Sequence, residues 1–444
     1  MSNTIVEKFL AATASIPAAA PLRIGFSGGL DSTVLLHLVV SHLPHTEVAA
    51  IHVNHGLAKE AAAWQAHCQA LASSWQVAFS TESVVVTNQG AGVEDAARQA
   101  RRAVFKQHLP AGGVLLLAHH QTDQVETLLL RLLRGSGPLG LAAMAPRAPF
   151  AEGDLLRPLL AISRPELEHY AEQHGLTWVE DPSNQSVQFD RNFLRQEIIP
   201  HLQQRWPSLE ATVSRAANLC RESVVLAAER AAEDLVALEL RQELLGVSCQ
   251  LPPLLAWSRL RQADVLRHWL QTSAVELPAQ AVLTQIFQQL LVDDYQSDNQ
   301  PCVSWPGASL QRFRNRLYLL PTLAPVAAID CSWSGLEPLV LPGGGQLSLQ
   351  PGGPLRWQGE PLTVRNRQGG ERAHPAGRGH SQTLKKLLQE HKVEPWLRER
   401  LPLLYLGDQL AAVAGYWVEQ PFACSDQQQG YQLVWQPAWV AGKN

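Results

Sequence analysis

Short apolar segments alternate with longer helical segments between residues 22 and 134. Strands are expected at 22–26, at 48–53, within 76–87 and at 114–118, and helices at 32–43, 60–74, 92–109 and 122–134. Neighbouring parallel strands need a crossover, which a helix supplies. The alternation therefore predicts an α/β domain in which helices cover both faces of a parallel sheet. Ligands of such domains bind outside the carboxyl ends of the strands.

Composition divides the rest of the chain. At 444 residues the chain is too long for one ordinary core. Leu, Ala, Gln and Arg dominate from 209 to 320 without a strand pattern, which predicts a helical middle domain. Pro- and Gly-rich text at 321–356 predicts a linker region. We therefore expect domains at 1–208, 209–320 and 357–444, the last of them a small α/β domain.

Cysteine usage and hydropathy predict a cytoplasmic protein. The six cysteines lie far apart and form no C-x-x-C pair, which argues against a disulfide framework, a zinc knuckle or an iron–sulfur site. No apolar run approaches the roughly 18–20 residues that cross a bilayer. A short apolar stretch near the N-terminus resembles a secretion signal only faintly, because Glu7 and Lys8 directly precede it and a core strand follows. We expect no membrane contact.

Charge is unevenly distributed along the chain. The net charge of −4 does not suggest a nucleic-acid binder. Residues 361–400 nevertheless carry nine Lys or Arg against four Glu, together with three histidines. Such a segment is either a solvated face or an electrostatic surface for nucleic acid, and composition alone leaves both open.

The first expected strand and helix are joined by the glycine-rich loop SGGLDS. Gly28 and Gly29 let the backbone turn sharply and approach a ligand, and the amides at the start of the following helix favour an anion. Ser27 and Ser32 add hydroxyl donors. Asp31 would repel a bare phosphate, so it implies either a Mg²⁺ ion between the two or a helix-capping role. The loop predicts a phosphate site; the alternative is a plain capped turn.

Three further motifs accompany this loop. They are HVNHGL at 52–57, AHHQTDQVET at 118–127 followed by RGSGPLG at 134–140, and DPSN at 181–184 followed by RNFLR at 191–195. In this order and spacing, the four motifs resemble the tRNA(Ile)-lysidine synthetase family, which belongs to the PP-loop ATP pyrophosphatases. The resemblance is strong over residues 20–205, weak through the middle domain, and reappears at 365–404.

The resemblance implies an ATP-dependent ligase. Such an enzyme uses ATP and Mg²⁺ to adenylate O2 of the wobble cytidine in the isoleucine tRNA with a CAU anticodon, and releases pyrophosphate. The amine of free lysine then displaces AMP and gives lysidine, which decodes AUA. On this reading residues 1–208 form the catalytic PP-loop domain, and residues 209–320 and 357–444 bind tRNA. A homodimer is left open.

The resemblance also implies a nucleotide site. The ATP-binding residues would be Ser27, Gly28, Gly29, Leu30, Asp31, Ser32, His52, Asn54, His55 and His119, with Asp31 as the metal ligand. The role of His119 stays open between nucleotide, metal and a structural cap. His52, Asn54 and His55 are placed to meet the adenosine, although polar residues at strand ends are common.

The expected catalytic residues are Asp31, Asp123 and Glu126. Asp123 and Glu126 are three residues apart on an expected helix, so they share one face near its N-terminus. A carboxylate pair there could bind the cationic lysine and take a proton from its ammonium group. The alternative is that acidic residues stabilise the helix dipole.

Basic residues supply the expected tRNA contacts. They are Arg98, Arg101, Arg191, Asn192, Arg195, Arg372, Arg378, Lys385 and Lys386, and Arg102 lies beside the first two. Arginine suits phosphate contacts, and lysines give a salt-sensitive one. A solvated face remains the alternative.

The chain departs from the family pattern at two positions. Thr122 stands where the family commonly has the first of two acids, which weakens any role for an additional carboxylate. Ala58 stands where an arginine often follows His-Gly-Leu, which removes one phosphate contact.

Three other functions remain in competition. A tRNA thiolase of the same superfamily would need cysteines near the site, and only Cys68 falls in the expected catalytic domain. An ammonia-using PP-loop synthetase would not need a basic C-terminal domain. A non-catalytic tRNA-binding protein would not need Asp31, Asp123 and Glu126.

Overall fold

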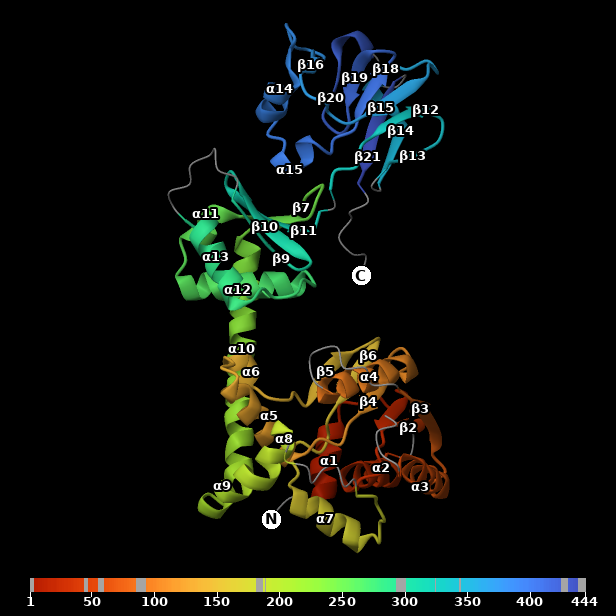
Figure 1. Cartoon of the computed structure of the whole chain (residues 1–444), viewed down its shortest axis with the longest axis vertical. Helices are drawn as coiled ribbons and strands as arrows, with labels where there is room; N and C mark the ends of the chain where they lie inside the picture. The colour runs from red at the N-terminus through yellow and green to blue at the C-terminus, as the bar shows by residue number, and fades with distance from the viewer. Residues whose placement is uncertain are drawn as a thin grey trace. The chain divides into compact units, whose positions relative to one another are not determined.

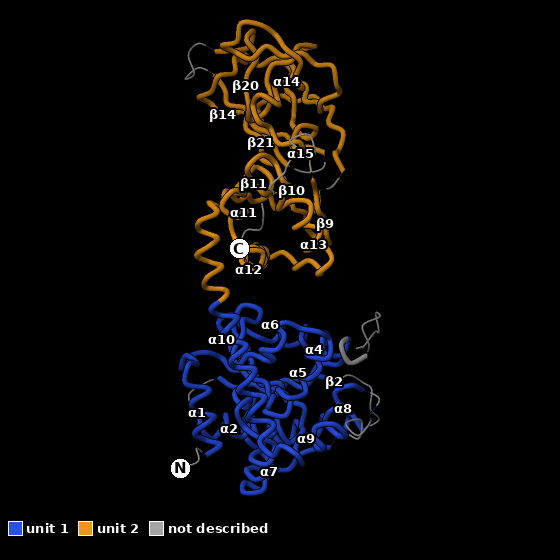
Figure 2. Tube along the Cα trace, turned by 90° about the vertical axis from the view of Figure 1, so that its left-hand side faces the viewer, with its two compact units in different colours: residues 1–226 blue, residues 227–444 orange. Residues whose placement is uncertain are grey.

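The computed structural model describes residues 4–43, 47–54, 60–84, 93–180, 187, 189–292, 301–323, 325–342, 345–424 and 430–437. The chain forms two compact units, Met1–Leu226 and Ala227–Asn444, shown in two colours in Figure 2. The boundary falls inside helix α10 (Leu209–Ala237).

A six-stranded sheet forms the centre of the first unit, with strand order β3-β2-β1-β4-β6-β5. The strands are β1 (Leu22–Gly25), β2 (Val48–Asn54), β3 (Ala78–Ser83), β4 (Val114–Leu116), β5 (Arg147–Phe150) and β6 (Gly153–Leu156). All neighbouring strands are parallel except β5, which pairs with β6 in the antiparallel sense. The predicted α/β class with a parallel sheet is confirmed.

Helices join the parallel strands, as the alternation predicted (Figure 1). They are α2 (Leu30–His42), α3 (Ala61–Ser74), α4 (Val93–His108) and α5 (Gln121–Leu133). Helices α1 (Ile5–Thr13) and α7 (Arg164–Gln173) were not expected, and both pack against α2. Leu22, Ile24, Leu35 and Phe9 are fully buried in this core. Burying each such side chain contributes about 1.5–3 kcal/mol.

A second helical group in this unit lies against α5. It comprises α6 (Pro138–Leu141), α8 (Asp190–Phe193), a π-helical turn η2 (Leu194–Ile198) and α9 (Ile199–Arg205). Val125 of α5, Leu194 of η2 and Ile199 of α9 form a small buried cluster that fixes η2 and α9 to α5.

The first part of the second unit is not purely helical. It contains the last part of α10 and the helices α11 (Leu251–Leu255), α12 (Arg259–Thr272) and α13 (Gln280–Gln289). It also contains an antiparallel sheet of order β7-β8-β11-β10-β9, formed by β7 (Arg241–Gln242), β8 (Val247–Gln250), β9 (Cys302–Trp305), β10 (Ala308–Phe313) and β11 (Arg316–Pro321). The expectation that residues 209–320 lack strands is therefore wrong.

Three strands also lie within the expected linker at 321–356. They are β12 (Asp330–Trp333), β13 (Leu339–Val340) and β14 (Gln346–Leu355). β12 pairs with β15 (Leu362–Arg365), and β14 pairs with β21 (Tyr431–Gln436). This segment belongs to the C-terminal fold, so the linker prediction is wrong for these strands.

The C-terminal fold is a small α/β arrangement. The other strands are β16 (Arg372–Ala373), β17 (Gln382–Thr383), β18 (Leu403–Leu406), β19 (Gln409–Val413) and β20 (Trp417–Val418), and the helices are α14 (Leu384–Glu390), α15 (Pro395–Arg398) and a 3₁₀ turn, η3 (Gln420–Phe422). Trp396 of α15 packs edge-on against Tyr318 of β11, with ring centroids 4.9 Å apart.

All six cysteines are free. Among the described residues, no helix has both the length and the apolar character needed to cross a membrane.

Candidate functional site

Gly28 is the residue that shapes the glycine-rich loop. Its φ of +84° is a conformation that side chains rarely adopt. A Cβ atom there would lie 2.6 Å from Cys68 Sγ and 2.9 Å from Val179 Cγ2. Only glycine therefore fits this position without displacement of its neighbours.

The loop is fixed by hydrogen bonds from other elements. The Val179 amide donates to Gly28 O at 2.9 Å, and His52 Nδ1 donates to Phe26 O at 2.9 Å. Burial lowers the pKa of His52, which favours the neutral ring. His52, expected to meet the adenosine, thus supports the loop that precedes α2.

Helix α2 presents its first amides and two hydroxyl groups beside the loop. Gly29 is the N-cap, and the first intrahelical amide bond runs from Thr33 to Gly29 O, so the amides of 30–32 have no acceptor within the helix. The Ser27 and Ser32 hydroxyls lie 3.1 Å apart. The Ser32 hydroxyl donates to Gly29 O at 3.0 Å, so the amides of 30–32 are the donors that suit the oxygens of a phosphate.

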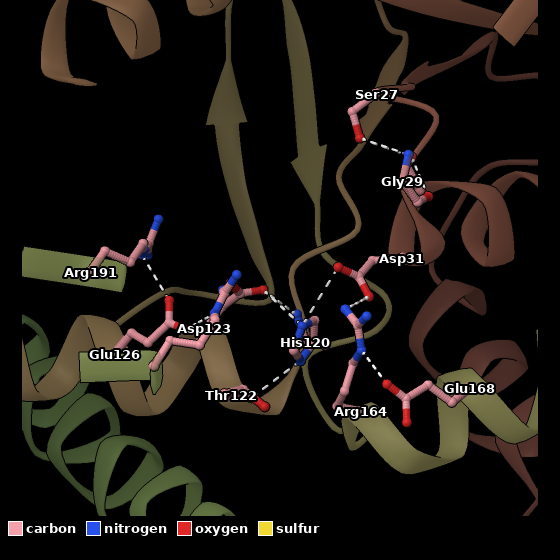
Figure 3. A network of polar contacts seen from close by, with 12 residues as sticks. Ser27, Gly29, Asp31, His120, Thr122, Asp123, Glu126, Arg164, Glu168 and Arg191 are labelled. Atoms are coloured by element: carbon pink, nitrogen blue, oxygen red, sulfur yellow. Dashed lines mark hydrogen bonds and ion pairs between the residues drawn. The ribbon is translucent and has the colours of Figure 1, made fainter. Parts of the chain in front are cut away.

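Asp31 is the second residue of α2 and does not cap the helix. Its Oδ1 accepts a hydrogen bond from Arg164 Nη1 at 3.0 Å, and its Oδ2 lies 3.7 Å from His120 Nε2 (Figure 3). Burial raises the pKa of Asp31, although His120 and Arg164 oppose this shift. The capping alternative for Asp31 is therefore not supported.

His120 lies between Asp31 and Asp123 (Figure 3). Its ring caps α5, because Nδ1 accepts from the Thr122 amide at 3.3 Å. In the neutral ring the proton is therefore on Nε2, the atom that lies 3.7 Å from a carboxylate oxygen of Asp31 and 3.7 Å from one of Asp123. His120 thus connects the loop to the carboxylates of α5.

Asp123 and Glu126 face the same side of α5, as predicted, but they differ in their contacts. Asp123 Oδ2 accepts from the His120 amide at 2.9 Å and completes a capping box. Glu126 is fully buried and has no capping role. The alternative of a helix-stabilising acid thus applies to Asp123 and not to Glu126.

Two arginines from α8 and η2 pair with these carboxylates. Arg195 Nε donates to Glu126 Oε1 at 2.5 Å, and its Nη2 donates to Asp123 Oδ1 at 3.1 Å. Arg191 Nε lies 2.9 Å from Glu126 Oε2 in an ion pair without hydrogen-bond geometry, and its Nη2 donates to Thr127 Oγ1. The expected tRNA contacts Arg191 and Arg195 thus lie at the carboxylates.

The environments separate the pKa values of the two carboxylates on α5. Burial raises the pKa of Glu126, although Arg195 partly offsets the effect. Burial also acts to raise that of Asp123, but His120, His119 and the capping amide outweigh it, so the pKa of Asp123 is lowered. Two carboxyl groups with opposite shifts are suited to different roles at one pH.

A magnesium ion fits the position of Asp31. Its carboxylate is 31% exposed and pairs with Arg164 Nη1 at 3.0 Å, so part of it is accessible to a cation. No cluster of three or more His, Cys, Asp or Glu with metal-binding geometry occurs among the described residues. Magnesium is commonly held by one or two carboxylates together with substrate phosphates, so a single aspartate beside a phosphate loop is sufficient.

The other predicted nucleotide-binding residues differ in their surroundings. Burial lowers the pKa of His119 to about 4, and its Nδ1 has no hydrogen-bond partner among the described residues. The Asn54 amide donates to Gln65 Oε1 at 3.4 Å. His55, Ala58 and the DPSN motif at 181–184 lie outside the described residues.

The predicted arginines of α4 lie at the surface. Arg98, Arg101 and Arg102 are exposed, and Arg102 lies over the Phe150 ring at 4.7 Å. Burial, together with repulsion from Arg98, Arg102 and Arg131, lowers the pKa of Arg157 to about 10. A positive cluster therefore forms at the α4 side of the sheet.

The C-terminal basic residues lie at the surface. Arg372 Nη2 donates to Ser381 O at 3.1 Å, and Arg378 pairs with Glu390 at 2.7 Å. Lys385 and Lys386 are exposed on α14. Part of the positive charge is thus paired within the protein, and the two lysines remain accessible.

Sequence reasoning missed three residues of the site. Arg164 pairs with Asp31, and its only signal was its place at the start of α7, after Ser163. His120 was quoted in a motif without a role. The third residue is Glu210 of α10, which accepts a hydrogen bond from Thr122 Oγ1 at 2.6 Å. Helix α10 thus supplies a carboxylate beside the position where the family commonly has an acid.

Comparisons with known proteins identify the family. Family models match as the PP-loop domain over residues 1–202, the TilS substrate binding domain over 250–318 and the TilS substrate C-terminal domain over 362–435. Relatives described as tRNA(Ile)-lysidine synthase include those of Coxiella burnetii (39% identical, 97% of this chain and 96% of the relative), Salmonella newport (40%, 95% and 98%) and Serratia proteamaculans (41%, 93% and 95%). The family expected from the motifs is confirmed, and the chain belongs to the tRNA(Ile)-lysidine synthase family.

Proposed function

We propose that this protein forms lysidine on an isoleucine tRNA with a CAU anticodon, using ATP and free lysine. ATP adenylates O2 of the wobble cytidine with release of pyrophosphate, and the amine of lysine then displaces AMP. The observation that carries the proposal is that His120 connects Asp31 beside the phosphate loop to Asp123, which Arg195 joins to Glu126. One site thus offers a place for a triphosphate and a place for a cationic amine.

The first step needs the triphosphate fixed and the cytidine oxygen free to attack its α-phosphorus. The amides of 30–32 and the hydroxyls of Ser27 and Ser32 would bind phosphate oxygens. A magnesium ion on Asp31 would neutralise charge that develops on those oxygens. Arg164, which contacts Asp31 at 3.0 Å, would keep that carboxylate oriented.

The second step needs a neutral amine. Asp123, with its lowered pKa, stays ionised and attracts the ammonium group of lysine. Glu126, buried and with a raised pKa, is the better proton acceptor of the two. This division assigns binding mainly to Asp123 and proton removal to Glu126, and it requires Arg195 to yield part of its contacts to the substrate.

Basic residues support a tRNA substrate. Arg98 and Arg101 on α4, and Lys385 and Lys386 on α14, are exposed. Exposed cations of this kind bind phosphates through an electrostatic, salt-dependent contact. A cytoplasmic location is part of the proposal, and cell fractionation measures it. The homodimer stays open, and sedimentation of the purified protein measures it.

The test combines purified protein, ATP, labelled lysine and the isoleucine tRNA transcript with a CAU anticodon. Label should enter the tRNA only when ATP is present, with pyrophosphate released in equal amount. The methionine tRNA, which also has a CAU anticodon, serves as the matched control. Turnover that depends on ammonia or sulfide instead of lysine would contradict the proposal.

A further inference from the structure

Exposed aromatic side chains are confined to one short segment. Among the Phe, Tyr and Trp residues that the structure describes, only Phe189, Phe193 and Trp206 are exposed, at 41%, 44% and 56%. All three fall within residues 189–206, which comprise α8, η2 and α9. Aromatic side chains are costly to leave in water, so their concentration here indicates a binding surface.

This segment has two different faces. Arg191 and Arg195 contact Glu126, and Leu194 is buried against α5. Phe189 and Phe193, four residues apart, remain exposed on the same short helical stretch. The two phenyl rings therefore flank the carboxylate site without being part of it. The π-helical turn that follows is a feature common at functional sites.

Positive charge accompanies these aromatic rings. Arg205 is exposed, forms no ion pair within the described ranges, and lies 6.0 Å from the centroid of the Trp206 ring. Aromatic faces interleaved with arginine are the composition that binds unpaired nucleotides, because bases stack on the rings and phosphates pair with the cations.

We propose that Phe189 and Phe193 stack unpaired bases of a single-stranded RNA loop beside the reacting nucleotide. The inference rests on the proposed function, in which a base of the anticodon loop must leave its neighbours so that its O2 atom can reach the phosphate. A base taken out of a stack loses favourable contacts, and aromatic side chains can replace them. The platform would hold the neighbours of the target base, while Arg191 and Arg195 remain with the carboxylates.

The experiment uses the full-length protein and an RNA stem-loop with 2-aminopurine next to its wobble cytidine. Stacking on a phenyl ring changes the emission of 2-aminopurine, and titration gives the dissociation constant. Phe189→Leu and Phe193→Leu keep apolar bulk and remove the aromatic face. Phe193→Trp restores an aromatic face. Leu226→Ala, at an exposed apolar position of α10, is the matched control.

Each leucine variant should bind the stem-loop about tenfold more weakly and lose the emission change. The salt dependence of binding should stay as in the wild type, because no charge is removed. Phe193→Trp and Leu226→Ala should behave as the wild type. Thermal unfolding should change little in all variants, because both phenylalanines are partly exposed and leucine keeps most of their apolar bulk.

Wild-type affinity and emission in both leucine variants would overturn the inference. So would unchanged RNA binding together with weaker self-association in sedimentation, which would make the surface a contact between copies of the chain. Lysine transfer to the intact tRNA is measured in parallel. No transfer by the wild type would refute the proposed function, whereas wild-type transfer with unaltered binding by the variants would refute only the stacking role.

Discussion

The carboxylate cluster of the first unit and the basic segment 361–400 of the second use charge differently. In the cluster, Asp31, Asp123 and Glu126 each pair with an arginine, and Glu126 is fully buried. In the basic segment, Lys385 and Lys386 are exposed. Buried charges act through fixed geometry, so one substitution should alter chemistry. Exposed charges act through a screened field, so their loss should be graded and salt-dependent.

Asp31→Asn should have the largest effect on activity. It tests whether the loss of one paired charge alters the chemistry without altering tRNA binding. The amide cannot supply the anionic oxygen that a magnesium ion needs, so pyrophosphate release should fall on the order of 10³-fold. tRNA affinity should stay unchanged. Asp154→Asn is the matched control, because Asp154 is also 31% exposed and paired with an arginine, Arg147. Full activity in Asp31→Asn would remove the metal role.

Glu126→Gln should separate the two chemical steps. Lysine transfer should fall about 10²-fold while pyrophosphate release persists, because the amide cannot accept a proton. In the wild type, transfer should decline as the pH falls through the pKa of Glu126, which burial places above its ordinary value of 4.5. Glu126→Gln should lack this decline. An equal loss of both steps in rapid-quench assays would refute the assignment.

Gly28→Ala tests whether the nucleotide site depends on the backbone conformation of the glycine-rich loop as well as on charge. The Cβ would lie 2.6 Å from Cys68 Sγ at a φ of +84°, so stability should fall by about 2 kcal/mol and ATP affinity about tenfold. Gly112→Ala has a similar φ of +71° with nothing within 4 Å, so it isolates backbone strain at about 1 kcal/mol. Equal losses of unfolding free energy in the two variants, measured by urea unfolding, would contradict the prediction. They would show that the structure relaxes the close contact between the new Cβ atom and Cys68.

The Lys385→Ala, Lys386→Ala double variant should give the smallest effect. Binding of tRNA should weaken several-fold at low salt, and the slope of log affinity against log salt should become shallower by about 2. Lysidine formation at saturating tRNA should not change. Arg267→Ala, an exposed arginine paired with Asp264, is the control outside the segment. An unchanged slope would show that α14 is an ordinary solvated face and does not bind tRNA.

Sequence patterns predicted those parts of the site whose residues are close together in the sequence. The βα turn is short and contiguous, so its glycines, hydroxyls and aspartate could be identified together, and Asp123 and Glu126 follow from helical spacing. Arg164 could not be found this way, because its contact with Asp31 joins α7 to α2. The burial of Glu126 likewise depends on packing, whereas the capping contact of Asp123 with the His120 amide is local in sequence.

The missed strands show the same limit at the level of the fold. β14 contains Pro351, Gly352 and Gly353, which locally indicate a turn, and its register shifts between Pro351 and Leu355. Its partner β21 lies at Tyr431–Gln436, far along the chain. Pairing between distant segments, which turn propensity does not report, makes this segment a strand.

One backbone contact limits how far the phosphate loop can be treated as an independent module. The Gly28 carbonyl accepts a hydrogen bond from the Val179 amide, which follows α7 and is distant from Gly28 in the sequence. A chimera that transplants residues 22–42 into another α/β protein would carry every letter of the motif without this donor. A truncation that ends before Val179 would likewise keep SGGLDS and lose the conformation that makes it useful.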